Sequence, residues 1–147
     1  MLFSKKKRRI TRILVVEDEP LVAFETEHHL IEEGFEIVAT VDSVADAVAA
    51  LSGGSEIHLV LVDMTLVDGS GLDVARAAST KGVHVMFVTA EWPGDAAKGL
   101  AAGCLGKPYA ARDLTAAIAV VEKMRDGGAP PKRLPPSFSL FAGVTDT

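Results

Sequence analysis

Apolar residues follow two patterns along this chain: short unbroken runs and longer stretches with helical spacing. Residues 57–62, Ile-His-Leu-Val-Leu-Val, form a nearly continuous apolar run, which is typical of a strand buried on both faces of a sheet. Val44, Ala47, Val48 and Leu51 recur at the i, i+3, i+4, i+7 spacing of an amphipathic helix. Together the patterns predict strands at 13–16, 35–41, 57–62, 83–88 and 103–106. They predict helices at 21–33, between Ser43 and Gly53, and at 72–80, 94–102 and 110–125.

This alternation of strand and helix predicts an α/β fold with a parallel sheet covered by helices on both faces. Right-handed crossovers in a body of this size favour a flavodoxin-like, doubly wound sheet of five strands in the order 2-1-3-4-5. The helix expected at 94–102 is the weakest element, because Gly94 and Gly99 lower its stability.

Polar side chains follow four of the predicted strands at the point where each strand ends. Glu17 and Asp18 follow the first strand and Asp63 follows the third. Thr89 follows the fourth strand and Lys107 follows the fifth. In an open parallel sheet, ligands bind outside the carboxyl ends of the strands, where the strand order reverses. We therefore expect these five side chains to meet at one edge of the sheet.

Three carboxylates in one crevice repel one another and raise each other's pKa, a conflict that a hard divalent cation removes. Mg²⁺ binds one or two carboxylates together with water and phosphate oxygens, and the backbone carbonyl of Thr65 is a candidate further ligand. Such a site suits phosphoryl transfer to a carboxylate nucleophile, Asp63. Lys107 would supply positive charge and Thr89 a hydroxyl to the moving phosphoryl oxygens.

With these residues in this order, the chain resembles the receiver domains of bacterial two-component response regulators over about residues 11–126. The resemblance implies that Asp63 is the phosphoacceptor for a sensor histidine kinase or phosphotransfer protein. It also implies that Glu17 and Asp18 bind Mg²⁺, that Thr89 and Lys107 contact the phosphoryl group, and that the Lys107–Pro108 peptide is cis. Asp68-Gly69 matches the loop that follows the family's phosphoacceptor.

The chain departs from that family in the region through which receivers usually signal. Cys104 stands three residues before the lysine, where most receivers carry a Tyr or Phe that moves with the threonine. Tyr109, Phe87 and Trp92 are the candidate replacements. The segment from Thr89 to Lys107 is also short, which implies a truncated fourth helix. The chain is similar to stand-alone receivers that lack the aromatic switch and carry Phe-x-Thr and Lys-Pro-Tyr.

Charge and length narrow the choice of function. The 147 residues predict one domain with a net charge of −5, and residues 13–126 hold 19 acidic and 7 basic side chains. So acidic a body argues against nucleic-acid binding. The single cysteine and the absence of a long apolar stretch or signal pattern predict a cytoplasmic protein that does not insert into membranes.

Both ends of the chain differ in composition from the body. Residues 1–10 are expected to form a flexible basic arm, with weak attraction to an anionic membrane surface or an acidic partner as the alternative. Residues 127–147 form a Pro- and Gly-rich tail, too short for an output domain. We expect this tail to be frayed. The alternative is that Phe138, Leu140 and Phe141 dock on the body or on a partner.

The function predicted from these patterns is a stand-alone phosphorelay receiver that signals by protein interaction or drains phosphoryl groups from a kinase. On this interpretation the chain is not an enzyme beyond catalysing its own phosphorylation and dephosphorylation. A small Mg²⁺-dependent phosphatase with an aspartyl-phosphate intermediate is one alternative, although Thr65 stands where a second, acidic aspartate would be needed. A degenerate receiver that acts only as an interaction module is the other. The downstream partner is not predicted.

Overall fold

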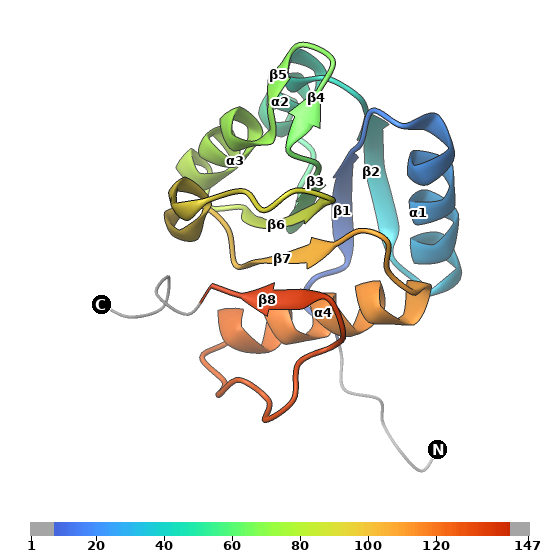
Figure 1. Cartoon of the computed structure of the whole chain (residues 1–147). Helices are drawn as coiled ribbons and strands as arrows, with labels where there is room; N and C mark the ends of the chain where they lie inside the picture. Colours follow the sequence, from blue (N-terminus) through green and yellow to red (C-terminus); the bar gives the residue numbers. More distant parts are fainter. Residues whose placement is uncertain (1–7, 142–147) are drawn as a thin grey trace.

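The computed structural model describes residues 8–141, and its centre is a six-stranded sheet (Figure 1). The strands lie in the order β2-β1-β3-β6-β7-β8, the first five parallel and β8 antiparallel to β7. The strands are β1 (Arg12–Val16), β2 (Glu36–Val41), β3 (Leu59–Val62), β6 (His84–Thr89), β7 (Gly103–Gly106) and β8 (Phe138–Leu140). The helices are α1 (Pro20–Glu32), α2 (Val44–Ser52), α3 (Gly71–Thr80) and α4 (Ala111–Arg125), with a 3-10 helix η1 (Asp95–Gly99).

The five parallel strands confirm the predicted flavodoxin-like order, since β6 and β7 are the fourth and fifth of them along the chain. Val16 at the end of β1 pairs with Val62 of β3, and Val62 pairs with Phe87 of β6. This register aligns the carboxyl ends of three neighbouring strands. The residues that follow each strand therefore emerge at one edge of the sheet.

The apolar core consists of two layers, one on each face of the sheet. Figure 1 shows the helices that cover the two faces. On one face, α2, α3 and η1 cover the sheet through buried side chains such as Leu51, Val74 and Ala97. On the other face, α1 and α4 contribute Leu30 and Ile118. All four residues of β3 are buried, which explains why its sequence is apolar without alternation.

Two regions differ from the sequence-based expectation on the first of these faces. The helix predicted at 94–102 is reduced to the single 3-10 segment η1. The loop predicted after Asp63 contains a small antiparallel hairpin, β4 (Thr65–Leu66) with β5 (Gly69–Ser70). A pairing of two residues per strand is too short to give an alternating apolar pattern, so periodicity did not predict it.

The part of the N-terminal arm that the structure describes is anchored to the body. The Arg8 guanidinium lies 4.2 Å from the centre of the Phe35 ring and donates a hydrogen bond to the Glu33 carbonyl at the end of α1. The backbone N–H groups of Arg9 and Ile10 donate to the Glu122 carboxylate on α4. The flexible arm expected over 1–10 is therefore wrong for its last three residues, whereas residues 1–7 lie outside the described residues.

The C-terminal segment docks on the body, which was the alternative interpretation, and it is not frayed as expected over residues 138–141. Phe138–Leu140 forms β8 on the edge of β7, and the Phe138 and Phe141 side chains are buried.

The attraction to a membrane surface raised for the basic arm rests largely on residues outside the described range. Within residues 8–141, no helix is both long and apolar enough to cross a bilayer.

Ile10 provides a test of whether the anchored arm belongs to the core, because its side chain is 1% exposed. Ile10→Ala is expected to lower the free energy of unfolding by about 2–4 kcal/mol, the cost of truncating a buried isoleucine. Ile31→Ala is the matched control, since Ile31 is 54% exposed on α1 and the same change there should cost less than about 0.5 kcal/mol. Urea unfolding measures both, and equal losses would contradict the anchored arm.

Candidate functional site

The structure brings the predicted site residues together at the carboxyl edge of the sheet. Glu17 and Asp18 directly follow β1, and Asp63 directly follows β3. Thr89 is the last residue of β6, and Lys107 directly follows β7. The Lys107 N–H donates to the Thr89 carbonyl at 3.0 Å, which continues the β6–β7 pairing up to the site.

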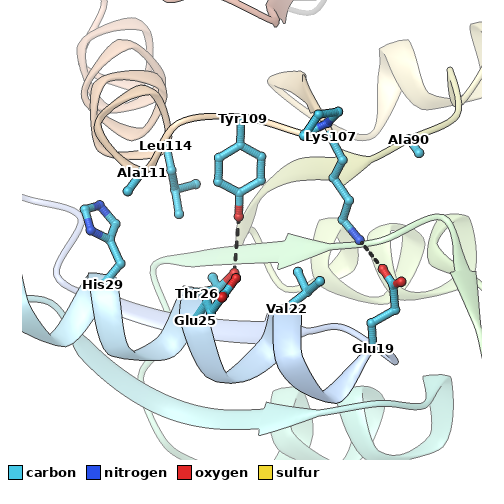
Figure 2. Close-up of a pocket in the computed structure, with 11 residues that line it drawn as sticks. Glu19, Val22, Glu25, Thr26, His29, Ala90, Lys107, Tyr109, Ala111 and Leu114 are labelled. Atoms are coloured by element: carbon cyan, nitrogen blue, oxygen red, sulfur yellow. Dashed lines mark hydrogen bonds and ion pairs between the residues drawn. The ribbon is translucent and has the colours of Figure 1, made fainter.

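Lys107 is the centre of the charged contacts. Its Nζ lies 2.7 Å from Oε1 of Glu17 and 2.8 Å from Oδ2 of Asp63. A third carboxylate, Glu19, lies 3.1 Å from the same nitrogen, and Figure 2 shows this contact reaching across from the start of α1. The Lys107 side chain is only 13% exposed, so the ammonium is largely surrounded by these acids. One cation therefore offsets the repulsion among several carboxylates.

Sequence reasoning missed Glu19. Its signal was present, since Glu17, Asp18 and Glu19 form an unbroken acidic run before Pro20. The expectation that ligands bind just beyond the ends of the strands singled out only Glu17 and Asp18. Glu19 reaches Lys107 because it is the N-cap residue of α1, at the corner where the chain turns away from the site.

The charges of the site shift the pKa values of its members in different directions. Burial raises the pKa of the Glu17 carboxyl above its usual 4.5, although Lys107 and the Glu19 N–H oppose the effect. Burial also acts to raise the pKa of Asp63, but Lys107 outweighs it with help from the Thr89 hydroxyl and the Met64 N–H, and the pKa falls below the usual 3.8. Burial acts to lower the pKa of Lys107, and its hydrogen bonds to Asp63, Glu17 and Glu19 raise it instead.

The backbone around Asp63 holds its carboxylate in one orientation. Oδ1 of Asp63 accepts a hydrogen bond of 2.7 Å from the Met64 N–H, while Oδ2 faces Lys107. The Gly71 N–H donates to the Met64 carbonyl at 2.7 Å. A Cβ atom on Gly71 would lie 2.1 Å from the Asp63 carbonyl oxygen, so glycine is required at the start of α3 for this close approach.

The loop after Asp63 is also attached to α2 through Asp68. The two carboxylate oxygens of Asp68 accept hydrogen bonds from the Val44 and Ala45 N–H groups, at 2.6 and 3.1 Å. These bonds satisfy donors in the first turn of α2 and lower the pKa of Asp68. Asp68 thus holds the loop against α2 through contacts that are separate from the charges around Lys107.

Thr89 connects the site to the segment that follows β6. Its side chain is buried, and its hydroxyl oxygen accepts a 3.2 Å hydrogen bond from the Glu91 N–H. The Glu91 carboxylate in turn accepts from the Thr65 hydroxyl at 2.9 Å. The Thr89 hydroxyl can therefore donate its own proton toward the site while it still accepts from Glu91.

Glu17, Asp18 and Asp63 fit a hard divalent cation. One carboxylate oxygen from each can be chosen so that all three lie within 4.8 Å of one another. Carboxylate oxygens at such spacing, open to solvent on one side, suit Mg²⁺, which keeps several of its waters. The Thr65 carbonyl as a further ligand stays a prediction.

The Lys107–Pro108 peptide is cis, as the resemblance implied. After it, Tyr109 turns toward α1, where its hydroxyl lies 3.2 Å from the Thr26 hydroxyl (Figure 2). Between α1 and this segment lies a cavity of about 610 Å³ that opens beside Lys107 and is lined by Glu19, Glu25, His29 and Leu114 among others. The cavity therefore adjoins the charged site on the α1 side.

Cys104 is buried in β7, within the core cluster on the α2–α3 face. Burial, with a smaller effect from Asp63, raises the pKa of its thiol to about 11, so the thiol is protonated at neutral pH. Of the candidate replacements for the missing aromatic ring, Tyr109 is hydrogen-bonded to Thr26 and Phe87 is fully buried. Trp92 is 57% exposed and contacts Phe141 edge-on.

The fold and the site together define an α/β protein with a lysine-bridged cluster of carboxylates at the carboxyl edge of a doubly wound sheet. The family described as the response regulator receiver domain matches residues 13–119, and the chain belongs to this family.

The chain is 36% identical over 124 residues to the sensory transduction protein RegX3 of Mycobacterium tuberculosis, a match that covers 81% of this chain and 53% of RegX3. It is 37% identical over 82 residues to the phyllosphere-induced regulator PhyR of Methylorubrum extorquens, covering 54% of this chain and 31% of PhyR. The chain thus spans about half the length, or less, of these curated relatives.

Solved structures of receivers share the fold. The receiver domain of a putative Luxo repressor protein from Vibrio parahaemolyticus is similar with a TM-score of 0.67 and 28% identity, over 79% of this chain and 95% of that one. The response regulator PhyR from Brucella abortus is similar with a TM-score of 0.69 and 25% identity, over 82% of this chain and 51% of that one.

Removal of the Lys107 charge should make stability depend on pH in a defined way. Without Mg²⁺, Lys107→Met is expected to cost roughly 2 kcal/mol of unfolding free energy at pH 7, because buried carboxylates lose their counter-charge. The lowered pKa of Asp63 stabilises the wild-type fold above about pH 4 and is lost as the pH falls through the folded-state pKa. In Lys107→Met the same carboxyls are buried without a counter-charge, so their pKa values rise and they take up protons as the pH falls from 7 toward 4. The difference between wild type and variant should therefore shrink over that range, and shrink further below pH 4 as Asp63 of the wild type is protonated.

Lys98→Met is the matched control, because the Lys98–Asp95 ion pair of 3.3 Å lies on the surface. That change should cost less than about 0.5 kcal/mol at either pH. Urea unfolding in the presence of EDTA measures all three proteins. A Lys107 effect of equal size at pH 7 and pH 4 would contradict the described charge network.

Proposed function

We propose that this receiver accepts a phosphoryl group on Asp63, from the phosphohistidine of a sensor histidine kinase or phosphotransfer protein, in a Mg²⁺-dependent reaction. The observation that carries the proposal is the position of Asp63 between a lysine and a candidate cation site. Lys107 lies 2.8 Å from one oxygen of its carboxylate, and the candidate cation site with Glu17 and Asp18 adjoins it.

The residues of this chain suit each part of that reaction. The Asp63 carboxylate, with its lowered pKa, is ionised at neutral pH and is the nucleophile. Its oxygen attacks phosphorus, an O–P bond forms, and the bond from phosphorus to the histidine nitrogen breaks. When bound, Mg²⁺ neutralises charge on the phosphoryl oxygens. Lys107 then pairs with a phosphoryl oxygen in place of the free carboxylate, and the Thr89 hydroxyl donates to another.

The face formed by α1 suits the phosphoryl donor. Leu21 and Phe24 on this helix are exposed at 76% and 65%, beside the acidic Glu25 and the cavity that leads to Lys107. Exposed apolar side chains of this size are typical of an interaction surface. We therefore infer that the kinase or phosphotransfer protein docks along α1, next to the nucleophile.

We further propose that the chain signals by protein–protein interaction or serves as a phosphate sink, and that it is not an enzyme for other substrates. Its likeness to part of the response regulator PhyR supports a signalling role, and the acidic body supports partners other than nucleic acid. The single cysteine, a buried free thiol, supports a cytoplasmic location.

Phosphorylation can be tested with a small donor. Incubation with acetyl phosphate and Mg²⁺ is expected to give one phosphoryl adduct by intact-mass spectrometry, and EDTA should abolish it because the carboxylates then lack their cation. Asp63→Asn should give no adduct. Asp68→Asn is the matched control and should still be phosphorylated, since Asp68 caps α2 instead of lining the site.

An adduct that persists in Asp63→Asn would contradict the proposal. Continuous turnover of a small phosphate ester would favour the phosphatase alternative. A chain that forms no adduct with either acetyl phosphate or a kinase would be a degenerate receiver that acts only as an interaction module.

A further inference from the structure

The strand β8 covers the outer edge of β7. Its pairs with β7 are Leu140 with Gly103, Ser139 with Cys104 and Phe138 with Leu105. Backbone hydrogen bonds extend the pairing at both ends, from the Gly106 N–H to the Ser137 carbonyl at 2.8 Å and from the Phe141 N–H to the Ala102 carbonyl at 2.9 Å. An uncovered edge strand offers its backbone groups to any extended chain, and here the protein's own C-terminal segment fills that place.

Two aromatic side chains anchor β8, one on each face of the sheet. Phe138 is buried in the cluster that contains Leu105 and α4, and Phe141 is buried in the cluster that contains Cys104. Ser139 between them is exposed. The edge of β7 thus offers two apolar sites for aromatic residues spaced three apart, joined by backbone hydrogen bonds.

Gly103 shapes the edge for this occupant. A Cβ atom on Gly103 would lie 2.5 Å from the Ser139 carbonyl oxygen and 2.7 Å from Cζ of Phe138, so a larger residue would exclude the strand. At Gly106 a Cβ atom would lie 3.6 Å from the Ser137 carbonyl oxygen, an ordinary contact. The edge therefore accommodates β8 only because residue 103 has no side chain, whereas a methyl group at position 106 would still leave room for the strand.

Several features make β8 suited to leave the sheet. It is only three residues long, and between it and α4 the chain has no helix or strand and contains Pro130, Pro131, Pro135 and Pro136. Ser137, at its start, has a φ of +66°, a backbone conformation that is unfavourable for a residue with a Cβ atom. Release of β8 would remove this strain while α4 stays in place.

Two contacts connect β8 to the site. The Trp92 and Phe141 rings meet edge-on with their centres 5.7 Å apart, and Trp92 follows Glu91, whose N–H donates to the Thr89 hydroxyl. At the other end of β8, the Ser137 carbonyl accepts from Gly106, the residue before Lys107. The segments that carry Thr89 and Lys107 therefore both abut β8.

We propose that the edge of β7 is a strand-binding surface, covered by β8 until Asp63 carries a phosphoryl group and then open to an extended segment of an output partner. The gating, by which phosphorylation of Asp63 opens this surface, rests on the proposed function. Contact of the phosphoryl oxygens with Thr89 and Lys107 shifts the Glu91–Trp92 and Gly106 segments, and this weakens the two contacts at the ends of β8. The partner binds by strand addition.

The present occupant defines the chemistry of the partner. Residues 138–141, which comprise β8 and Phe141, read Phe-Ser-Leu-Phe, and Lys132 and Arg133 precede them along the chain. We therefore expect an uncharged extended segment with aromatic residues three apart, flanked by basic residues that complement the acidic body. Exchange of β8 between two copies of this chain is a separate outcome, which the mass of the complex distinguishes.

The test uses the full-length chain and a labelled synthetic peptide with the sequence of residues 134–141. In the presence of Mg²⁺, beryllofluoride loading of Asp63 is expected to tighten peptide binding at least about tenfold, a typical allosteric coupling. Loading should also shift the emission of Trp92, the single tryptophan, and speed amide exchange at Phe138–Leu140. A peptide with serine in place of both phenylalanines should not bind.

Variants separate the surface from its gating. Phe141→Ala should release β8 and bind the peptide without loading, because the peptide supplies the missing ring. Gly103→Ala should abolish peptide binding in both states, whereas Gly106→Ala, the matched control, should retain it. Circular dichroism checks that each variant is folded. Failure of folded Phe141→Ala to bind the peptide would overturn the strand-binding surface.

The experimental outcomes distinguish failure of this inference from failure of the proposed function. If mass spectrometry shows the phosphoryl adduct while Trp92 emission, β8 exchange and peptide affinity stay unchanged, the gating is overturned and the phosphoacceptor role stands. If no adduct forms, the phosphoacceptor role and the gating both fail, and Phe141→Ala still decides whether the edge binds a strand. A peptide-induced or loading-induced dimer with exchanged β8 would overturn the choice of a foreign partner.

Discussion

The repulsion among carboxylates at one edge of the sheet is the constraint on which the site depends. Parallel strands bring Glu17, Asp18 and Asp63 together whether or not their charges are compensated. Lys107 compensates part of that charge by contacting three acids with one ammonium group. What remains is a net negative charge, which a divalent cation would neutralise and which would repel a phosphoryl group if no cation were bound. The fold therefore creates an electrostatic demand that the proposed chemistry satisfies.

Much of this arrangement could be predicted from sequence because it follows from local patterns. Buried parallel strands require continuous apolar runs, so β1, β3 and β6 were recognisable, and strand ends share one edge, so Asp63 and Thr89 could be placed beside Lys107. The family resemblance then assigned roles to positions that the residues alone left open. The family is confirmed by the match over residues 13–119, whereas the roles of the individual residues remain proposals.

Features that depend on distant contacts were not predictable. Glu122 binds the Arg9 and Ile10 backbone from more than a hundred residues away, and no local pattern marks such a pair. The same holds for β8, whose three residues carry no periodic signal and whose position depends on the absence of a side chain at Gly103. Composition predicted the preceding linker, and docking of Phe138 and Phe141 on the body was one of two interpretations that the sequence left open. Phe141 also packs in the core cluster that contains Cys104, and no local pattern in the sequence indicates this.

The attachment of the Asp63 loop through Asp68 and Gly71 has a mechanical consequence. Asp68 ties the loop to the first turn of α2, and Gly71 joins it closely to the start of α3, so the nucleophile stands on a braced support. The opposite side of the site rests on β7, a four-residue strand that lies between β6 and the three-residue β8. We therefore expect that a ligand bound between the two sides displaces the β7 side and leaves the Asp63 loop in place.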